Sequence, residues 1–327
     1  MSGIKSSSAG SKTITHNFPL LFGSGVLPGL EVWMDGNDVD GNNVADGTDG
    51  AAVNSWTDKS GQNYNFTGKR GDPTSAIYNG LGVVNFDGDD GLYTNKVMHP
   101  NVPNFSMFSV HRYTSTGNTN RIISDRDWNW LFGSHGGNMK RSYFNGWLMN
   151  AGGGKDTLFH IHIATMNNTD KGNTWFDGTQ IITNGTGAHN SNYQPKKLQF
   201  GGYRTSNEYS KCEVAEFIVY NRVLPASERL LVEGYLAHRW NLTSVLDASH
   251  PYKTSSPALG GIIKPTLASA ASGYTSPIPV TLTFKKDGVN TAVTGFTTSD
   301  ISLSGGTMDG VLSGSGHTYS FNVTPST

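Results

Sequence analysis

Hydrophobic and polar residues alternate through much of the chain, and this pattern predicts β-strands. Residues 105–113, FSMFSVHRY, alternate with a period of two, which is typical of a strand with one buried face. Residues 157–168 and 172–184 predict a strand pair, and Asp177-Gly178 has the turn chemistry of a tight hairpin. Residues 213–220 are apolar at most positions, which indicates a strand buried on both faces.

One stretch departs from this pattern and predicts a helix. From Ala226 to Trp240 the apolar residues recur at intervals of three and four, as on one face of a helix. Pro225 precedes the stretch, at a position where its missing N–H does no harm. Glu228 near the start and Arg239 near the end match the helix dipole. The pattern therefore predicts an all-β chain that is closed late by a single helix.

The sequence around this strand and helix resembles a known family. Residues 213–242, EVAEFIVYNRVLPASERLLVEGYLAHRWNL, are similar to the end of LamG-like jelly-roll domains of the concanavalin A-like lectin/glucanase superfamily. SWTDKSG at 55–61, VVNFDGDDGL at 83–92 and residues 121–154 resemble further motifs of that family, in the same order. The resemblance covers residues 27–252 and implies an antiparallel β-sandwich jelly roll with one C-terminal helix. It implies little about a ligand, because a fold does not fix a function.

The segments on either side have a different composition. Residues 1–26 are polar apart from an apolar patch at 18–22, and we expect an arm that docks on the domain or on a partner, including another copy in a homo-oligomer. Residues 253–261, KTSSPALGG, predict a linker. Residues 262–327 alternate in short strands and resemble bacterial Ig-like repeats, which implies a small Ig-like β-sandwich. Because another strand normally follows in that family, we expect a truncated domain of a longer protein.

Composition and charge exclude several classes of function. The 327 residues have a net charge of −1 and no basic block, which argues against nucleic-acid binding by phosphate neutralisation. No apolar run reaches the roughly 18 residues that a membrane-spanning helix needs, so we expect no membrane insertion. Cys212 is the only cysteine, so no intrachain disulfide can form, and we expect it in the core. Residues 1–26 contain no apolar leader of the kind found in secretory signal peptides. We nevertheless expect an extracellular place, on a virion surface or a bacterial cell surface.

The most specific local motif is an acidic loop at 38–49, DVDGNNVADGTD. Its oxygen-bearing side chains and one backbone carbonyl have the spacing of an EF-hand-type calcium loop. The predicted ligands are Asp38, Asp40, Asn42, Val44, Asp46 and Asp49. Asn43 stands where such a loop prefers glycine, but asparagine tolerates the left-handed conformation. We expect structural Ca²⁺ here, and the alternative is a solvated acidic turn without an ion. Asp87, Asp89 and Asp90 form a second acidic group that we interpret as a plain turn.

Candidate sugar-binding residues come from the middle of the predicted jelly roll. Sugar sites combine aromatic faces with amide, carboxylate and arginine groups. Trp128 and Trp130 alternate on one strand face, while Asp127 and Asn129 face the other way. The candidate residues are Trp128, Trp130, Asp127, Asn129, His135, Trp147 and Arg204. The alternative is that the two tryptophans pack between the sheets.

The sequence offers little support for catalysis. Related glucanases carry an E-x-D-x-x-E strand with two catalytic carboxylates, and this pattern is absent. Glu213 and Glu216 are three residues apart in a predicted strand, so we expect them on opposite faces. His160 and His162 share one strand face, and in the absence of an obvious third ligand we expect structural roles rather than a metal site.

These observations predict a non-enzymatic, lectin-like attachment module that recognises surface glycans and carries a structural calcium ion. The alternative is a structural protein of a phage or virus particle, such as a capsid decoration, fibre or spike component, which needs no sugar ligand. Its partners would then be other virion or surface proteins.

Overall fold

The computed structural model describes residues 27–98, 104–144, 146–167, 169, 171–186, 195–204, 208–257, 264–269, 277–286, 289–290, 292–293, 296–298, 301 and 306–325. The chain divides into two compact units, of which residues 27–257 form one and the described residues from 264 onward belong to the other. The expected N-terminal arm, residues 1–26, lies outside the described residues.

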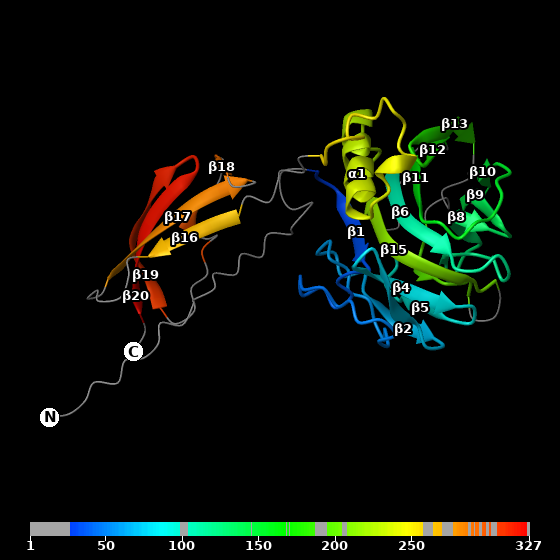
Figure 1. The fold of residues 1–327 in the computed structure, drawn as a ribbon, viewed down its shortest axis with the longest axis horizontal. Coiled ribbons are helices and arrows are strands. Elements are labelled where there is room, and N and C mark those ends of the chain that lie inside the picture. The colour runs from blue at the N-terminus through cyan, green and yellow to red at the C-terminus, as the bar shows by residue number, and fades with distance from the viewer. Residues whose placement is uncertain are drawn as a thin grey trace. The chain divides into compact units, whose positions relative to one another are not determined.

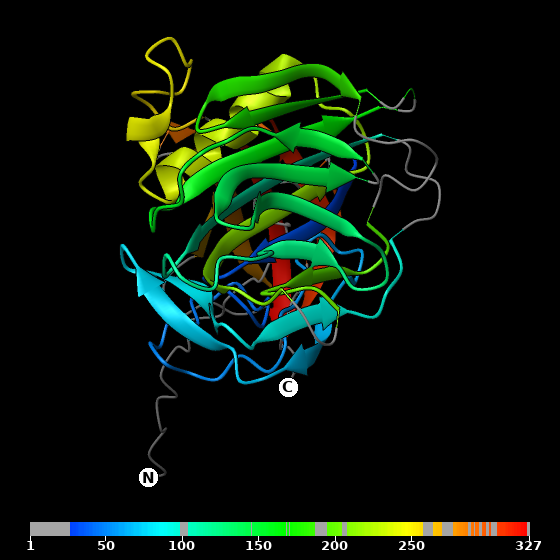
Figure 2. The same ribbon diagram turned by 90° about the vertical axis from the view of Figure 1, so that its right-hand side faces the viewer.

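Two antiparallel sheets build the larger unit (Figure 1, Figure 2). The first sheet has the strand order β13-β12-β11-β6-β15-β4-β3, and β1 also pairs with β15. Its strands are β1 (Leu30–Asp35), β3 (Thr74–Tyr78), β4 (Leu81–Asp87), β6 (Phe105–Tyr113), β11 (His160–Met166), β12 (Lys171–Phe176), β13 (Thr179–Thr186) and β15 (Lys211–Tyr220).

The second sheet has the strand order β10-β9-β8-β7-β14-β5-β2. Its strands are β2 (Phe66–Arg70), β5 (Gly91–Thr94), β7 (Ile123–Asp125), β8 (Trp130–His135), β9 (Asn138–Phe144), β10 (Trp147–Asn150) and β14 (Leu198–Phe200). Together with one helix near the end of the unit, α1 (Ala226–Arg239), these sheets confirm the predicted all-β sandwich that is closed by a helix.

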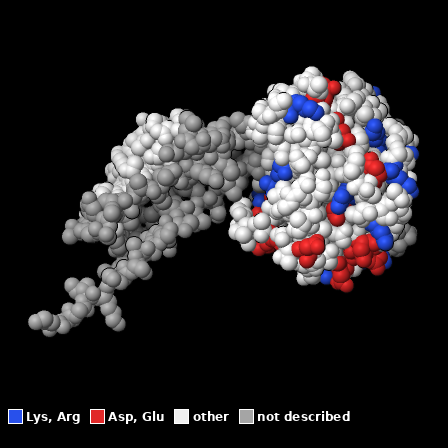
Figure 3. Space-filling model, in the orientation of Figure 1, with Lys and Arg blue, Asp and Glu red and all other residues white. Residues whose placement is uncertain are grey.

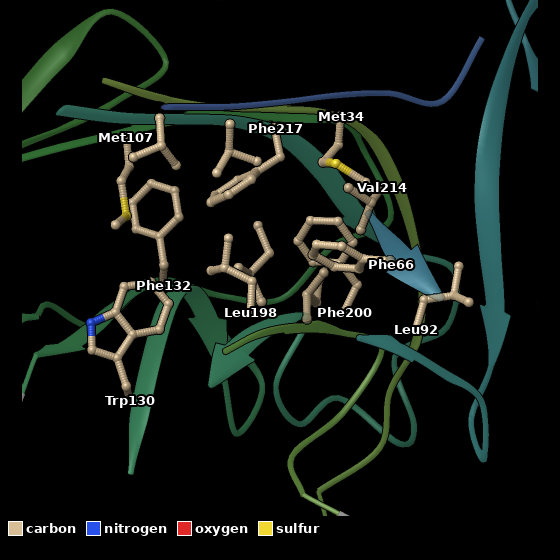
Figure 4. Close-up of a cluster of buried hydrophobic side chains, with 14 of the residues drawn as sticks. Met34, Phe66, Leu92, Met107, Trp130, Phe132, Leu198, Phe200, Val214 and Phe217 are labelled. Atoms are coloured by element: carbon tan, nitrogen blue, oxygen red, sulfur yellow. The ribbon is translucent and has the colours of Figure 1, made fainter. Parts of the chain in front are cut away.

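The core of the unit lies between the two sheets (Figure 4). Figure 4 shows side chains of the first sheet pointing toward side chains of the second, in two facing layers. Met34, Met107, Val214 and Phe217 belong to the first layer, and Leu92, Trp130, Phe132, Leu198 and Phe200 to the second. Cys212 is buried in the same cluster, as expected. Large apolar side chains of this kind supply most of the free energy that holds two sheets together.

The central strand β15 contains a bulge at Ala215, where the register with β6 shifts between Val214 and Glu216. The Ala215 carbonyl accepts a hydrogen bond from the N–H of Gly36 at 2.8 Å instead. One extra residue reverses the alternation of side chains, so Glu213 and Glu216 both point away from the core. The expectation that these two glutamates face opposite ways is therefore wrong, because the strand is not regular between them.

Helix α1 lies against the outer face of the first sheet, where it contacts β6 and β11. Glu216 is fully buried beneath it and accepts hydrogen bonds from Trp33 Nε1 at 2.8 Å, Trp240 Nε1 at 2.7 Å and the Tyr235 hydroxyl at 3.0 Å. Burial raises the pKa of Glu216 to about 7, although the nearby Arg239 guanidinium acts in the opposite direction. The carboxyl group of Glu216 thus connects both helix α1 and strand β1 to β15.

The W-x-D-K-S-G motif at 56–61 holds the start of the domain together. Asp58 accepts hydrogen bonds from the backbone N–H groups of Trp33 at 2.9 Å and Tyr64 at 2.9 Å. The ammonium of Lys59 contacts Asp35 at 3.3 Å and also contacts Asp38. These contacts explain the motif structurally: it fixes the loop after β1 against β1 itself.

Residues 253–257 pack with the larger unit rather than beginning a separate linker. The Lys253 ammonium donates to the carbonyls of Thr243 at 2.8 Å, Ser244 at 3.0 Å and Leu246 at 2.7 Å. These carbonyls belong to the short 3-10 helix η1 (Thr243–Val245) and to the residue that follows it. Among the described residues, no helix is both long and apolar enough to span a membrane.

The described residues of the second unit form one five-stranded antiparallel sheet, with the order β16-β17-β20-β19 and β18 paired to β17. Its strands are β16 (Lys264–Ser269), β17 (Ile278–Lys286), β18 (Val289–Asn290), β19 (Gly306–Ser315) and β20 (Thr318–Pro325). Leu282, Phe284, Tyr319 and Phe321 form its buried cluster. The second layer of an Ig-like sandwich is not among the described residues, so the Ig-like assignment stays a prediction.

Candidate functional site

The outer faces of the two sheets of the larger unit differ in what covers them. Helix α1 covers part of the outer face of the first sheet. The outer face of the second sheet instead carries half-exposed aromatic rings from several strands and loops, each with a lysine or arginine over it. These aromatic residues are Tyr93, Trp128, Trp147 and Tyr203. This face is where most of the predicted sugar-binding residues lie.

The buried carboxylate of Asp125 organises the centre of this face. Asp125 is 0% exposed and accepts hydrogen bonds from the backbone N–H groups of Asp127 and Trp128, each at 2.7 Å. It also accepts from the N–H of Lys196, and from that of Lys197 at 2.7 Å. Burial raises the pKa of Asp125, and the four N–H donors partly offset this effect. We call residues 126–128 and 196–197, which this carboxylate holds together, the Asp125 platform.

The side chains of the Asp125 platform form a connected polar surface around Trp128. The Lys196 ammonium lies 4.1 Å from the centre of the Trp128 ring, and the Lys197 ammonium pairs with Asp127 at 2.9 Å. Arg204 donates to the Asp127 carbonyl at 3.0 Å. The structure therefore brings the predicted residues Asp127, Trp128 and Arg204 together at one place.

Arg121 connects the platform to the neighbouring loop. Its guanidinium donates to Asn129 Oδ1 at 2.8 Å, contacts Glu208 and lies 3.9 Å from the centre of the Tyr203 ring. His135 Nε2 lies 3.7 Å from Glu208. The predicted residues Asn129 and His135 thus belong to the same surface, but Arg121 already occupies the Asn129 carbonyl oxygen.

Trp147 extends this surface to the edge strand β10. Its side chain is 41% exposed, packs edge-on against Tyr143 at 5.2 Å and has the Arg141 guanidinium 5.3 Å from its ring centre. His135 lies 6.3 Å from the same ring. Trp147 is accordingly the most exposed large aromatic side chain among the predicted residues.

Trp130 does not belong to the surface, and its prediction as a sugar-binding residue is wrong. Its side chain is 1% exposed and stacks on Phe144 at 4.9 Å inside the core. The bend at 126–129 separates Trp128 from β8, so the two tryptophans do not alternate along one strand. The alternative of packing between the sheets is correct for Trp130 alone.

The acidic loop after β1 gathers three of its predicted oxygen ligands. Carboxylate oxygens of Asp38, Asp40 and Asp46 lie within 4.8 Å of one another. Asn42 donates to Asp40 at 2.7 Å. Asn43 has a φ of +67°, so it adopts the left-handed conformation that the sequence analysis required at this position.

Asp38 is 3% exposed, and its Oδ1 has no hydrogen-bond donor among the described residues. Its other oxygen accepts from the N–H of Asn43 at 3.0 Å and contacts Lys59. Asp49 is exposed and is not part of the oxygen group, because the N–H of Gly50 bonds to Ser75 at 2.8 Å and draws the chain toward β3. The prediction of Asp49 as a ligand is therefore not supported, while Val44 is exposed on the loop.

The second acidic group lies in a turn, and carboxylate oxygens of Asp87, Asp89 and Asp90 lie within 4.8 Å of one another, so its interpretation as a plain turn without an ion stays a prediction. Asp90 is 2% exposed and accepts from the N–H groups of Asp72 at 2.6 Å and Asp87 at 3.0 Å. Burial raises its pKa.

Two histidines stack inside the core. The rings of His111 and His162 lie 4.1 Å apart and nearly parallel, and both side chains are 0% exposed. His111 contacts Ser109 and Ser134, each at 3.0 Å, whereas neither nitrogen of His162 has a hydrogen-bond partner among the described residues. Burial lowers the pKa of His111 to about 3 and that of His162 well below its ordinary value, so both are neutral at pH 7.

His160 has a different environment at the start of β11. It contacts Asp177 at 2.6 Å through Nδ1 and Asp156 at 2.9 Å through Nε2. Burial lowers its pKa, but the two carboxylates outweigh burial and the net shift is upward. Its two nitrogens bind carboxylates on opposite sides of the ring, which is an arrangement for a buried ion pair.

Sequence reasoning identified arginines of this surface as candidate polar groups but missed its lysines, Lys196 and Lys197. Arg126 lies 3.5 Å from the centre of the Tyr93 ring, and Lys196 covers Trp128. The two cations are 70 positions apart in the sequence, and only the pairing of β7 with β14 brings them together. The motif R-D-W at 126–128 was a usable signal, but the lysine pair at 196–197 carries none by itself.

The sequence matches no family model and no curated protein. The LamG-like and bacterial Ig-like resemblances therefore stay predictions.

Several solved structures resemble this chain. The binding domain of Paraclostridial Mosquitocidal Protein 1 has a TM-score of 0.48 and 11% identity, over 84% of this chain and 67% of that one. Domain 4 of AbnA, a GH43 extracellular arabinanase from Geobacillus stearothermophilus in complex with arabinotriose, has a TM-score of 0.39 and 12% identity, over 55% of this chain and 97% of that one. Trypanosoma rangeli sialidase in complex with sialic acid has a TM-score of 0.40 and 15% identity, over 63% of this chain and 33% of that one. The match thus spans about a third of the sialidase chain, and at these identities it assigns neither family nor ligand.

Proposed function

We propose that the larger unit is a non-enzymatic, lectin-like module that holds surface glycans on the outer face of its second sheet. The observation that supports this most strongly is the Asp125 platform, a rigid polar surface with Trp128 at its centre. Trp128, Asp127, Arg204, Asn129 and His135 all belong to the surface around it. Aromatic rings combined with charged and amide groups are the chemistry that sugar recognition needs.

The glutamates of β15 are engaged in holding the fold together. Glu213 pairs with Arg112 at 2.8 Å, and Glu216 is buried beneath α1 with three neutral donors. Neither is placed as one of two facing carboxylates in an open groove, which glycoside cleavage requires. Binding without bond cleavage is therefore our proposal for this module.

The loop after β1 is proposed to bind structural Ca²⁺ through Asp38, Asp40 and Asp46, with further oxygens from Asn42 and the Val44 carbonyl. The buried Oδ1 of Asp38, which lacks a donor among the described residues, supports this proposal because a bound cation would satisfy it. The Lys59 ammonium on the other oxygen already supplies part of the positive charge. The ion would connect this loop to β1, several strands away from the sugar-binding face.

A glycan array tests the proposed function with the wild-type chain, Trp128→Ala and the control Trp175→Ala. Trp175 is also covered by an arginine, Arg229 at 4.3 Å, but it lies on β12 in the first sheet. We expect glycan binding by the wild type and the control, and loss of binding in Trp128→Ala with an unchanged circular dichroism spectrum. Binding that persists in Trp128→Ala would overturn the assignment of the face, and no binding by the wild type would overturn the function. Assembly into a virion and extracellular display stay predictions.

A further inference from the structure

The aromatic rings on the outer face of the second sheet are already covered by cations. The pairs are Tyr93 with Arg126 at 3.5 Å, Tyr203 with Arg121 at 3.9 Å, Trp128 with Lys196 at 4.1 Å and Trp147 with Arg141 at 5.3 Å. A cation over an aromatic ring is attracted to its π electrons. A neutral sugar that stacks on one of these rings would have to displace the cation. An anionic sugar could instead form an ion pair with the cation where it lies.

The charge around the Asp125 platform is not balanced. Asp127 is the exposed carboxylate of the platform, and it pairs with Lys197 at 2.9 Å. Among the described residues, no carboxylate pairs with Arg126 or Lys196, and the side chain of Arg204 contacts a backbone carbonyl and an aromatic ring but no carboxylate. The four cations Arg126, Lys196, Lys197 and Arg204 therefore stand against two carboxylates, the exposed Asp127 and the buried Asp125, in a chain whose net charge is −1.

The rest of the larger unit shows that this excess is local. Figure 3 shows acidic side chains gathered at the lower end of the larger unit, around the region where Figure 1 places β2. Basic side chains, with some acidic ones among them, are spread along the side where Figure 1 places β8, β9 and β10. Because β2 is the edge strand of the second sheet itself, the local field favours an anion around the Asp125 platform and not over the whole sheet.

The platform fixes the backbone segments that carry its cations. Asp125 binds the backbone of both Lys196 and Lys197 and of both Asp127 and Trp128. The Arg126 guanidinium lies 3.5 Å from the centre of the Tyr93 ring, and a guanidinium can donate two parallel N–H bonds to the two oxygens of one acid group. Pre-positioned donors lose less conformational entropy when a ligand binds, so this arrangement suits a carboxylate on a sugar ring.

From this geometry we propose that the ligand of this face is an acidic saccharide, whose uronic-acid carboxylates pair with Arg126 and Lys196. This inference rests on the proposed glycan-binding function and names the class of glycan. The sugar rings would lie along the aromatic residues between the platform and Trp147. Because Arg126 and Lys196 are only partly buried, their ion pairs with the sugar carboxylates are screened by salt, and binding weakens as the salt concentration rises.

Isothermal titration calorimetry with oligogalacturonate tests the proposal, with its methyl ester as the uncharged match and dextran sulfate as the sulfate arm. We expect oligogalacturonate to bind, and Arg126→Gln and Lys196→Gln each to weaken binding at least about tenfold. The control Lys211→Gln removes an exposed lysine of β15 in the first sheet and should leave the affinity unchanged. Lys196→Arg keeps the charge and should keep the binding, which separates lost charge from lost folding.

The outcomes separate this proposal from the proposed function. Equal affinity for the methyl ester and the acid, with binding still lost in Trp128→Ala, would overturn the acidic class and keep a glycan-binding module. Tighter binding of dextran sulfate than of oligogalacturonate would show that the surface prefers a sulfate ester to a carboxylate and would overturn the uronic-acid assignment. Equally tight binding of single-stranded DNA at the same salt concentration would show a general polyanion surface and overturn the saccharide. No binding of any glycan would overturn both.

Discussion

The stacked histidine pair in the core makes the stability of the larger unit depend on pH in a way that can be isolated. His111 is 0% exposed, and burial lowers its pKa from 6.5 to about 3. In the unfolded chain the same imidazole has its ordinary pKa, so it takes up a proton as the pH falls below 6.5 while the folded form does not. The contribution to stability is therefore present above pH 6.5 and is lost progressively as the pH falls toward 3.

The magnitude follows from the two pKa values. pH 5 lies about 1.5 units below the pKa of the His111 imidazole in the unfolded chain, and each pH unit corresponds to about 1.4 kcal/mol of unfolding free energy. His111 should therefore cost about 2 kcal/mol of unfolding free energy between pH 7.5 and pH 5. His162 acts in the same direction, because its pKa is also lowered by burial.

Urea unfolding of the wild type and His111→Gln, at pH 7.5 and at pH 5, measures this effect. His160 and Glu216 have raised pKa values, so they contribute with the opposite sign, but they are present in both chains. The difference between the two pH dependences should therefore be about 2 kcal/mol, with the variant losing less stability in acid. His160→Gln is the control of opposite sign, because it removes a histidine whose protonation stabilises the folded form, and it should lose more stability in acid.

Identical pH dependence in the wild type and His111→Gln would refute the reasoning. It would mean that the imidazole is solvated or protonated in the folded chain, and that the stacked pair in the core is not formed. A variant that is uniformly less stable at both pH values would leave the difference unchanged, since that cost does not depend on protonation.

Three further predictions concern the rest of the larger unit. Calcium at about a hundred times its Kd should raise the melting midpoint by about 5–10 °C; Asp38→Asn should abolish the shift and Asp49→Asn should keep it, and an equal shift in both variants would exclude this loop as the site. Trp240→Phe removes the 2.7 Å donor to Glu216 and should cost about 1–3 kcal/mol in urea unfolding, and an unchanged midpoint would show that the bond contributes nothing. Gly133→Ala places a Cβ at a φ of +95°, 2.5 Å from the nearest core imidazole, and should cost about 2–3 kcal/mol; a neutral effect by thermal melting would contradict this backbone geometry.

The sequence predicted the fold well where the signal was local. The helix at 226–239 was visible from its apolar spacing, and β6 and β15 from their residue types, because each element is defined by its own neighbours. The bulge at Ala215 left no such signal: it depends on Gly36, which is distant in the sequence and supplies the donor to its carbonyl. Without it, the face of Glu216 could not be assigned correctly.

The candidate site was predicted less completely, for a related reason. Aromatic and polar residues at 127–129 were identifiable by type, but Trp130 was misassigned because the bend before β8 interrupts the alternation. Lys196 became visible only through the hydrogen bonds of Asp125 to two separate segments. In the acidic loop, spacing correctly predicted the approach of Asp38 to its neighbours, whereas a contact with β3 removed Asp49 from the group.

Hydrogen–deuterium exchange with saturating oligogalacturonate tests the central claim most directly, because it maps the ligand without altering the chain. The outer face of the second sheet should become protected at residues 121–135 and 195–204, while α1 and the first sheet keep their exchange rates. Protection confined to α1, the first sheet or the acidic loop would contradict the account, since it would place the ligand away from the Asp125 platform.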